Sequence, residues 1–365
     1  LNTGIRFGGS SYDFTGGGNV TIAGYATLNT SNGSGLNINT VSTFNVSGGT
    51  NLTLTANTGK GTSIKTLAST SNITFNASSG NIAFNAVQTI SMGIGIATDS
   101  PITMVIGNGY TVNMTAFGGS WSFINNKTIT QTGAGKLTII GNSTSSTAVN
   151  IRAMITAEAD LNISSKQKNI SLYANLQSTN GNITLAAGTN YGAASTSVAN
   201  GSVTGGDIVV LGATSIAAGS GKTVTLYSGN ADTANLSALV TNGSTSQNKA
   251  YATAAYNGTV NVSKALNVFY RVSPVFSTTV NNKIYDGTTA ATIGPITGGI
   301  DGDTLTAAQA GVFANKNVGT GISVNLSNTV NASSAGFAST SATGMGYTVT
   351  GASANITQAN LTLTA

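Results

Sequence analysis

Residues 72–86 read NITFNASSGNIAFNA. The same short pattern occurs twice in these letters: an Asn, an aliphatic residue, a polar or small residue, a Phe, an Asn and an Ala. Apolar and polar side chains alternate in each copy, which predicts a short β-strand with one buried face. The Ser-Ser-Gly between the copies has the composition of a turn. We therefore expect two short strands joined by a turn.

The pattern recurs over the first two thirds of the chain, for example at residues 19–23, 51–56, 169–174, 182–186 and 223–227. This repeat region is too long to form a single β-sandwich, and tight hairpin dipeptides between its strands are few. Both features favour a parallel β-solenoid. Asn at the same place in each unit is suited to stacking from coil to coil. We expect an all-β fold, with a right-handed parallel β-helix over residues 1–272. Its coils should take roughly 20 residues each, about a dozen in all.

Three stretches interrupt the pattern and predict hairpins or loops that leave the solenoid, at residues 108–127, 187–206 and 229–255. The character of the sequence changes near Pro274, where we place a domain boundary. Residues 273–365 are expected to form a small β-rich domain, with one short helix at 304–313.

The composition excludes several functions. Charged residues make up 6% of the chain and hydrophobic residues 40%, so a core can form under a surface of hydroxyls and amides. The net charge of +5 includes no basic cluster, which argues against nucleic-acid binding. The chain has no His and no Cys, which removes most catalytic triads and zinc sites. No apolar run has the roughly 20 residues that a membrane-spanning helix needs. We expect no cofactor and no membrane insertion.

Two groups of carboxylates could still act in catalysis or bind a metal ion. Glu158 and Asp160, near Arg152, resemble the acidic face of a β-helical polysaccharide lyase or glycosidase. Such enzymes gather more acids in one groove, so a solvated turn is the alternative. Asp301 and Asp303 flank a Gly as in a calcium-binding turn, but the further oxygen ligands are missing from the spacing. We predict neither an enzyme nor a metal site.

The aromatic stretch is the better candidate for ligand binding. Sugars stack on aromatic faces, and a sugar carboxylate seeks Arg or Lys. The predicted ligand-binding residues are Tyr110, Trp121, Phe123 and Lys127. In the alternative interpretation, these aromatics cover the core where a coil is irregular.

The C-terminal segment resembles a YDG domain, a module that occurs, often in tandem, in large haemagglutinin-like adhesins. The resemblance rests on residues 283–289, KIYDGTT, and on the exit at residues 356–365. The N-terminal part resembles, by composition, the β-helical body of filamentous-haemagglutinin-type proteins exported by two-partner secretion. The secretion domain of that family is absent, so we expect an internal fragment of a longer protein.

About twenty Asn-x-Ser/Thr sequons add to these features. Together they resemble the high-molecular-weight adhesins of Haemophilus, in which a cytoplasmic transferase adds hexoses to such Asn residues. Only exposed turn asparagines are expected to be modified, and the candidates are Asn19, Asn32, Asn45, Asn113, Asn126, Asn142, Asn200, Asn242 and Asn257. Many sequons must also arise by chance in a chain so rich in Asn, Ser and Thr.

The resemblance implies a secreted protein of the bacterial outer-membrane surface. Its implied partners are an outer-membrane secretion protein, the cytoplasmic glycosyltransferase and host-cell glycans, which in that family are sialylated. We expect a monomeric adhesin. Two alternatives stay open: a stalk or biofilm-matrix scaffold without a binding site, and a β-helical polysaccharide-active enzyme.

Overall fold

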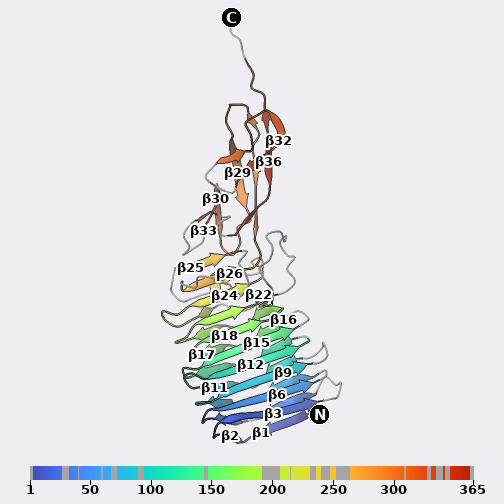
Figure 1. Cartoon of the computed structure of the whole chain (residues 1–365), viewed down its shortest axis with the longest axis vertical. Helices are drawn as coiled ribbons and strands as arrows, with labels where there is room; N and C mark the ends of the chain where they lie inside the picture. The colour runs from blue at the N-terminus through green and yellow to red at the C-terminus, as the bar shows by residue number, and fades with distance from the viewer. Residues whose placement is uncertain are drawn as a thin grey trace.

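The computed structural model describes residues 3–26, 33–39, 41–58, 61–66, 72–88, 94–119, 121–143, 147–190, 206–213, 215–230, 236–239, 247–251, 264–307, 310–326, 330–333, 340–341 and 346–361. These residues form an elongated molecule of stacked strands, with the N-terminus at one end and the C-terminal domain at the other (Figure 1). In this part of the chain the one helical segment is the 3-10 turn η1 (Leu236–Leu239). No described helix is long and apolar enough to cross a membrane.

Three parallel sheets form the faces of a solenoid. Sheet A contains β1 (Thr3–Gly8), β4 (Ser34–Asn39), β7 (Thr62–Thr66), β10 (Ile94–Thr98), β13 (Trp121–Asn125), β16 (Thr147–Ile151), β19 (Asn169–Leu172) and β22 (Ile208–Val210). Sheet B contains β2 (Ser11–Phe14), β5 (Thr43–Val46), β8 (Ile73–Ala77), β11 (Ile102–Ile106), β14 (Ile129–Thr132), β17 (Ile155–Ala157), β20 (Leu176–Ser178) and β23 (Ile216–Ala217). Sheet C contains β3 (Gly18–Ala26), β6 (Thr50–Thr58), β9 (Asn81–Gln88), β12 (Thr111–Gly118), β15 (Lys136–Ser143), β18 (Leu161–Ser165), β21 (Ile183–Ala186), β24 (Val224–Ser228), β26 (Leu266–Tyr270) and β25 (Gln247–Ala250).

Each coil contributes one strand to sheet A, then one to sheet B and one to sheet C. We name the corners of a coil by the sheets they join: A–B, B–C and C–A. The predicted parallel β-solenoid is confirmed, because from β1 to β26 the equivalent strands of neighbouring coils pair in parallel register, while β25 adds to the edge beyond β26. Within the described residues eight coils have all three strands, fewer than the dozen expected.

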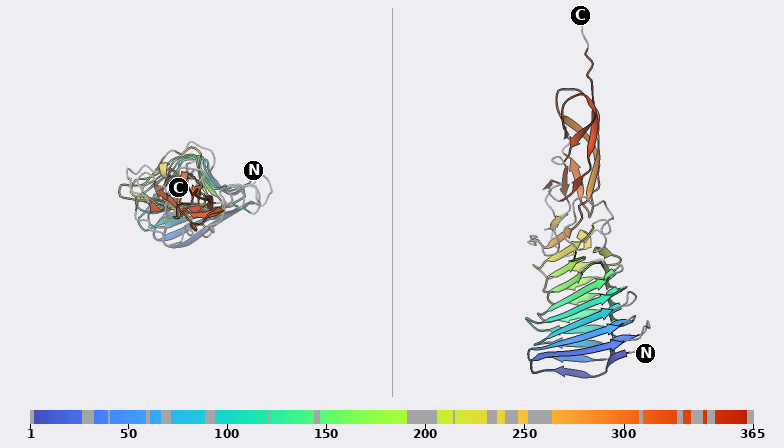
Figure 2. Two further views of the ribbon diagram at one scale, coloured as in Figure 1. Left: turned by 90° about the horizontal axis from the view of Figure 1, so that it is seen from above. Right: turned by 45° about the vertical axis from the view of Figure 1, so that its right-hand side comes forward.

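The coils are longer than expected at the N-terminal end and shorten along the chain as far as β21 (Ile183–Ala186), after which they lengthen again, to 41 residues between Asn182 and Thr223. Equivalent positions lie 32 residues apart between Asn19 and Asn51, but 22 apart between Asp160 and Asn182. The difference lies largely in sheet C, whose strands fall from nine residues in β3 to four in β21. Figure 2 shows the resulting taper from the N-terminal base upward. The prediction of 20 residues per coil was wrong because it assumed three equally short strands.

The core is a column of apolar side chains inside the coils. In sheet B the rings of Tyr12, Phe44 and Phe75 stack coil upon coil, with centroids 5.0 and 5.1 Å apart. Phe84 of β9 meets Phe75 edge-on from sheet C, at 4.9 Å. Such contacts favour one register, because a slip by one residue would turn the buried face of a strand outward.

The Asn residues of the repeat stack as expected. Asn51 donates its amide to the Asn19 side-chain oxygen at 3.0 Å, and Asn81 donates to Asn51 at 2.8 Å. The row continues on the next coil, where the Thr111 N–H donates to Asn81 at 2.8 Å. A second row in sheet B joins Asn76 to Asn45 at 3.2 Å. These rows satisfy side-chain groups along the axis of the solenoid.

The expected interruption at residues 108–127 was wrong. This stretch forms β12 and β13, two regular strands of sheets C and A. Val112, Met114 and Ala116 alternate into the core like the residues of the other coils. Of the expected loop at 187–206, residues 191–205 lie outside the described residues. The expected loop at 229–255 is described only at residues 229–230, in η1 (Leu236–Leu239) and at residues 247–251, which include β25.

The C-terminal residues form a separate mixed arrangement. A seven-stranded sheet has the order β28 (Lys283–Ile284), β36 (Ala352–Thr357), β32 (Gly319–Asn325), β31 (Ala310–Phe313), β29 (Ala290–Thr297), β27 (Val275–Val280) and β35 (Thr348–Val349). A smaller sheet contains β30 (Thr304–Ala307), β33 (Val330–Ser333) and β34 (Thr340–Ser341). The predicted helix at 304–313 was wrong, because the described residues of this stretch lie in β30 and β31, where Phe313 reaches the core.

Candidate functional site

The four predicted ligand-binding residues do not form one surface. Phe123 is fully buried in the core, so the expectation that it contacts a ligand was wrong. Tyr110 lies half-buried at a B–C corner and packs against the core. Trp121 begins β13 after a C–A corner, and exposed Lys127 follows the same strand at the A–B corner. Of the four, Trp121 takes part in a cluster that can bind a ligand.

That cluster is formed by Trp121, Arg152 and Tyr173, and we call it the arginine–aromatic cluster. The guanidinium carbon of Arg152 lies 5.0 Å from the centroid of the Trp121 ring and 5.8 Å from that of Tyr173. Arg152 directly follows β16 and Tyr173 directly follows β19, on the two coils after that of Trp121. Three successive strands of sheet A therefore supply the three side chains.

The backbone around Arg152 is held in place by the coils below and above. The Arg152 N–H donates to the carbonyl and side-chain oxygens of Asn125, at 3.2 and 3.1 Å. The buried Asn125 amide in turn donates to the Ala153 carbonyl at 2.7 Å. The Tyr173 N–H donates to the Ile151 carbonyl at 2.8 Å. The corner is thus rigid before any ligand arrives, which reduces the entropy lost on binding.

The cluster is also accessible. Arg152 is exposed, and 43% of the surface of Tyr173 is accessible to solvent. The ion pairs among the described residues do not include Arg152, so its guanidinium faces solvent without a carboxylate partner there. A guanidinium can take a carboxylate through two parallel N–H donors, while the adjoining rings offer faces for a sugar. The arrangement is suited to an acidic carbohydrate.

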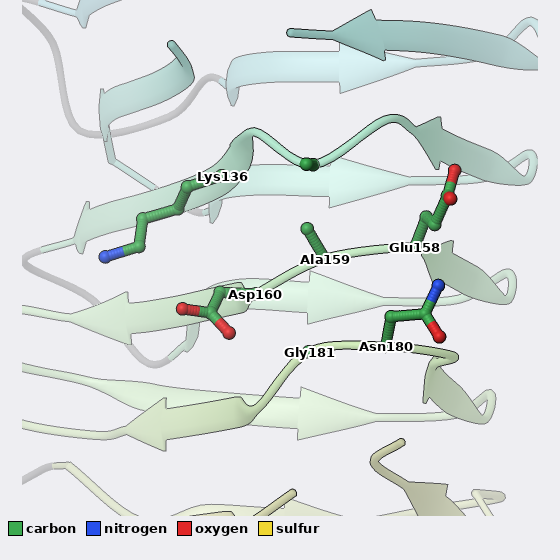
Figure 3. A pocket seen from close by; sticks show the side chains of 7 residues that line it. Lys136, Glu158, Ala159, Asp160, Asn180 and Gly181 are labelled. Carbon is green, nitrogen blue, oxygen red and sulfur yellow. The ribbon is translucent and has the colours of Figure 1, made fainter. Parts of the chain in front are cut away.

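Glu158 and Asp160 line a shallow hollow of about 250 Å³ at the B–C corner. In Figure 3 their carboxylates point away from each other along the turn between β17 and β18. Glu158 accepts the Gly133 N–H at 2.7 Å, and Asp160 accepts the Asn182 N–H at 2.8 Å. Each carboxylate thus pairs with the backbone of a neighbouring coil. This is the geometry of the turn that we considered as the alternative to an acidic catalytic face.

The acidic turn of Asp301 and Asp303 faces a lysine. Lys249 of β25 places its ammonium nitrogen 3.1 Å from Asp301 Oδ2 and 2.9 Å from Asp303 Oδ1. The Lys249 ammonium therefore contacts both carboxylates of the turn. No group of three or more potential metal ligands was found in the described part of the chain.

The predicted glycosylation sites differ in their surroundings. Asn19 and Asn126 are exposed, whereas Asn45, Asn113 and Asn142 are half-buried. The Asn45 amide nitrogen, which would carry the sugar, donates to Asp13 at 2.7 Å and to Ser11 at 3.1 Å. That of Asn126 donates to Asp99 at 2.6 Å. The sites outside the described residues are Asn32, Asn200, Asn242 and Asn257.

Comparison with known proteins identifies one region. A family model described as the YDG domain matches residues 270–354, the end of β26 and most of the C-terminal sheets. No curated protein and no solved structure matches the chain. The chain is therefore a β-solenoid followed by a region similar to the YDG domain. This combination is consistent with an adhesin-like protein.

Proposed function

We propose that this chain is part of a bacterial surface adhesin that binds acidic glycans of host cells, sialylated ones in particular. The proposal extends to a secreted protein of the high-molecular-weight Haemophilus type, exported by an outer-membrane partner and glycosylated by a cytoplasmic transferase. We also propose that it acts as a monomer and without enzymatic activity. The elongated solenoid and the match to the YDG domain support the adhesin class.

The observation that carries glycan binding is the exposed guanidinium of Arg152 between the Trp121 and Tyr173 rings. A sialic acid offers a carboxylate to the guanidinium and an apolar ring face to an aromatic side chain. The three residues come from consecutive coils, with Trp121 at the start of its strand and Arg152 and Tyr173 just past the ends of theirs, so the site crosses sheet A obliquely.

Binding of the purified chain to epithelial cells, with and without sialidase treatment, tests this proposal. We expect saturable binding that falls after sialidase. Arg152→Gln should weaken binding about tenfold or more, because it removes a charge-assisted pair worth about 1.5–3 kcal/mol. Lys136→Gln is the matched control, since it removes one exposed positive charge at the B–C corner. Equal binding by both variants would contradict the assignment of the site.

The second candidate is a stalk or matrix scaffold, and the stacked Asn rows favour it. They stabilise an extended rod without any ligand. A scaffold predicts no saturable binding to cells by this chain, with or without sialidase. That result would leave the adhesive site in another part of a longer protein.

A further inference from the structure

The junction between the solenoid and the C-terminal domain contains a closed cluster of ionisable groups. Lys249 comes from β25 at the edge of sheet C, and Asp301 and Asp303 come from the turn before β30. The side chains of all three are fully buried. The Lys249 nitrogen also donates to the Asp301 carbonyl, at 2.7 Å. One amine therefore faces two carboxyl groups at the point where the two parts of the chain meet.

Tyrosines surround this cluster. The hydroxyls of Tyr251 and Tyr347 both donate to Asp303 Oδ2, at 2.5 and 2.8 Å. The ring of buried Tyr270 stacks on that of Tyr251 at 5.2 Å. Burial raises the pKa of all three phenols, and the nearby carboxylates raise it further, so the phenols stay protonated donors. The rings keep water away from the amine and the carboxyls.

This arrangement is electrostatically unfavourable as an ion cluster. One ammonium and two carboxylates leave a formal charge of −1 in a buried site, and burial penalises every charged form. An amide between Lys249 and one carboxyl would replace an ammonium and a carboxylate by a neutral group. In a site that excludes water, the amide product is also protected from hydrolysis.

We propose that Lys249 and Asp301 form an intramolecular isopeptide bond that joins the solenoid to the C-terminal domain. The Lys249 nitrogen forms a bond to the side-chain carboxyl carbon of Asp301, and one carbon–oxygen bond of that carboxyl breaks. Asp303 accepts one of the two protons that the ammonium loses and passes it to the departing oxygen, then does the same with the second, so that this oxygen leaves as water. Asp303 ends as a carboxylate, so atoms and charge balance without any further reactant.

The contacts of the two carboxyls assign their roles. Asp303 accepts hydrogen bonds on both oxygens, from Lys249 and from the two tyrosines, which holds it in place to relay protons from the Lys249 nitrogen. Asp301 has a left-handed backbone, with φ of 48°, which turns both its carbonyl and its carboxyl toward Lys249. Holding the reacting groups together in this way replaces a bimolecular encounter, which lowers the barrier to such a condensation.

Mass spectrometry of the purified chain, made in a host without the glycosyltransferase, tests the bond. We expect an intact mass lower than that of the sequence by one water molecule. Trypsin should release a linked pair of peptides, 223–264 and 284–316, left uncut at Lys249. Asp303→Asn, which lacks the proton relay, and Lys249→Arg, which lacks the nucleophile, should have the full mass and no linked pair.

Two results would overturn the proposal. One is the full sequence mass in the folded wild-type chain. The other is the lower mass without the linked peptides, since a succinimide at Asp301-Gly302 would lose the same water. The chain also contains an internal control, the pair of half-buried Lys283 and exposed Asp286 at 2.7 Å. It should stay unlinked in the same digest, because water reaches it and no second carboxyl adjoins it in the described structure.

Discussion

Asparagine has two roles in this chain, and the structure assigns different residues to each. Asn19, Asn51 and Asn81 bond to one another along the solenoid, so their amides support the stacking of coils. Asn126 lies outside this row, at an A–B corner, and its amide donates to Asp99 of the preceding coil. The sequon alone is the same in Asn19 and Asn126 and does not tell these roles apart.

We predict that an asparagine glycosyltransferase modifies Asn126 far more fully than Asn45. The Asn45 amide is half-buried and donates to both Asp13 and Ser11, and a sugar on its nitrogen would break at least one of these bonds. Asn126 donates to Asp99 alone and is open to solvent. Glycopeptide mapping after co-expression with the transferase measures both occupancies. Higher occupancy at Asn45 would show that modification precedes folding and ignores the folded environment.

Single residues also show where prediction from the sequence fails. Trp121 and Phe123 lie two apart in one strand, so alternation assigns them to the same face. In the structure Phe123 enters the core, while Trp121 stays half-exposed because β13 begins there, just after a C–A corner. The start of a strand relative to a corner decides this difference, and the residue pattern does not specify it.

At the scale of the element, the strands themselves could be predicted and their pairing could not. Alternation located β6, β8, β9, β19 and β21, because each places apolar residues at every second position. The register between coils is not visible in the sequence, since the coil length changes from 32 to 22 residues. For that reason the arginine–aromatic cluster was missed, although Arg152 and Tyr173 both follow a strand of sheet A.

The turn after β28 explains the motif of the C-terminal domain. Asp286 Oδ1 accepts the Thr288 N–H and hydroxyl, both at 2.8 Å, and the Lys283 ammonium at 2.7 Å. Gly287 follows with φ of 78°, a conformation that costs other residues energy. Each residue of the Asp-Gly-Thr run thus has a part in closing the turn.

We predict that Asp286 titrates unusually low. Hydrogen bonds from Lys283 and then Thr288 lower its pKa from the usual 3.8 to about 2. Because the folded pKa lies below the unfolded one, this carboxylate contributes stability above pH 3.8 that is lost as pH falls through about 2. A carboxyl-carbon NMR titration measures the value directly. Asp286→Asn should remove the contribution, and a titration at 3.8 would contradict the turn geometry.

At the scale of the whole molecule, we predict two unfolding transitions. Phe75 is buried in the solenoid and Phe313 in the C-terminal sheet, and each should lose about 3–5 kcal/mol of local stability on replacement by Ala. The chain has one tryptophan, Trp121, so its fluorescence reports the solenoid alone. Phe75→Ala should shift the fluorescence transition, and Phe313→Ala should leave it in place while shifting a second transition in calorimetry. Equal shifts from both variants would mean that the two parts unfold together.

The taper of the solenoid has a mechanical consequence. The strands lie across the long axis, so the hydrogen bonds between coils run along it, and a pull on the two ends loads them one layer after another (Figure 1). When the hydrogen bonds of one layer break, the residues of one coil are free to extend. At about 3.3–3.6 Å per extended residue, a coil of 32 residues yields about 110 Å and one of 22 about 75 Å. A tethered molecule of this shape would therefore extend in steps of different length, and the coil between Asn182 and Thr223, with 41 residues, would give a longer step than the coils of the base.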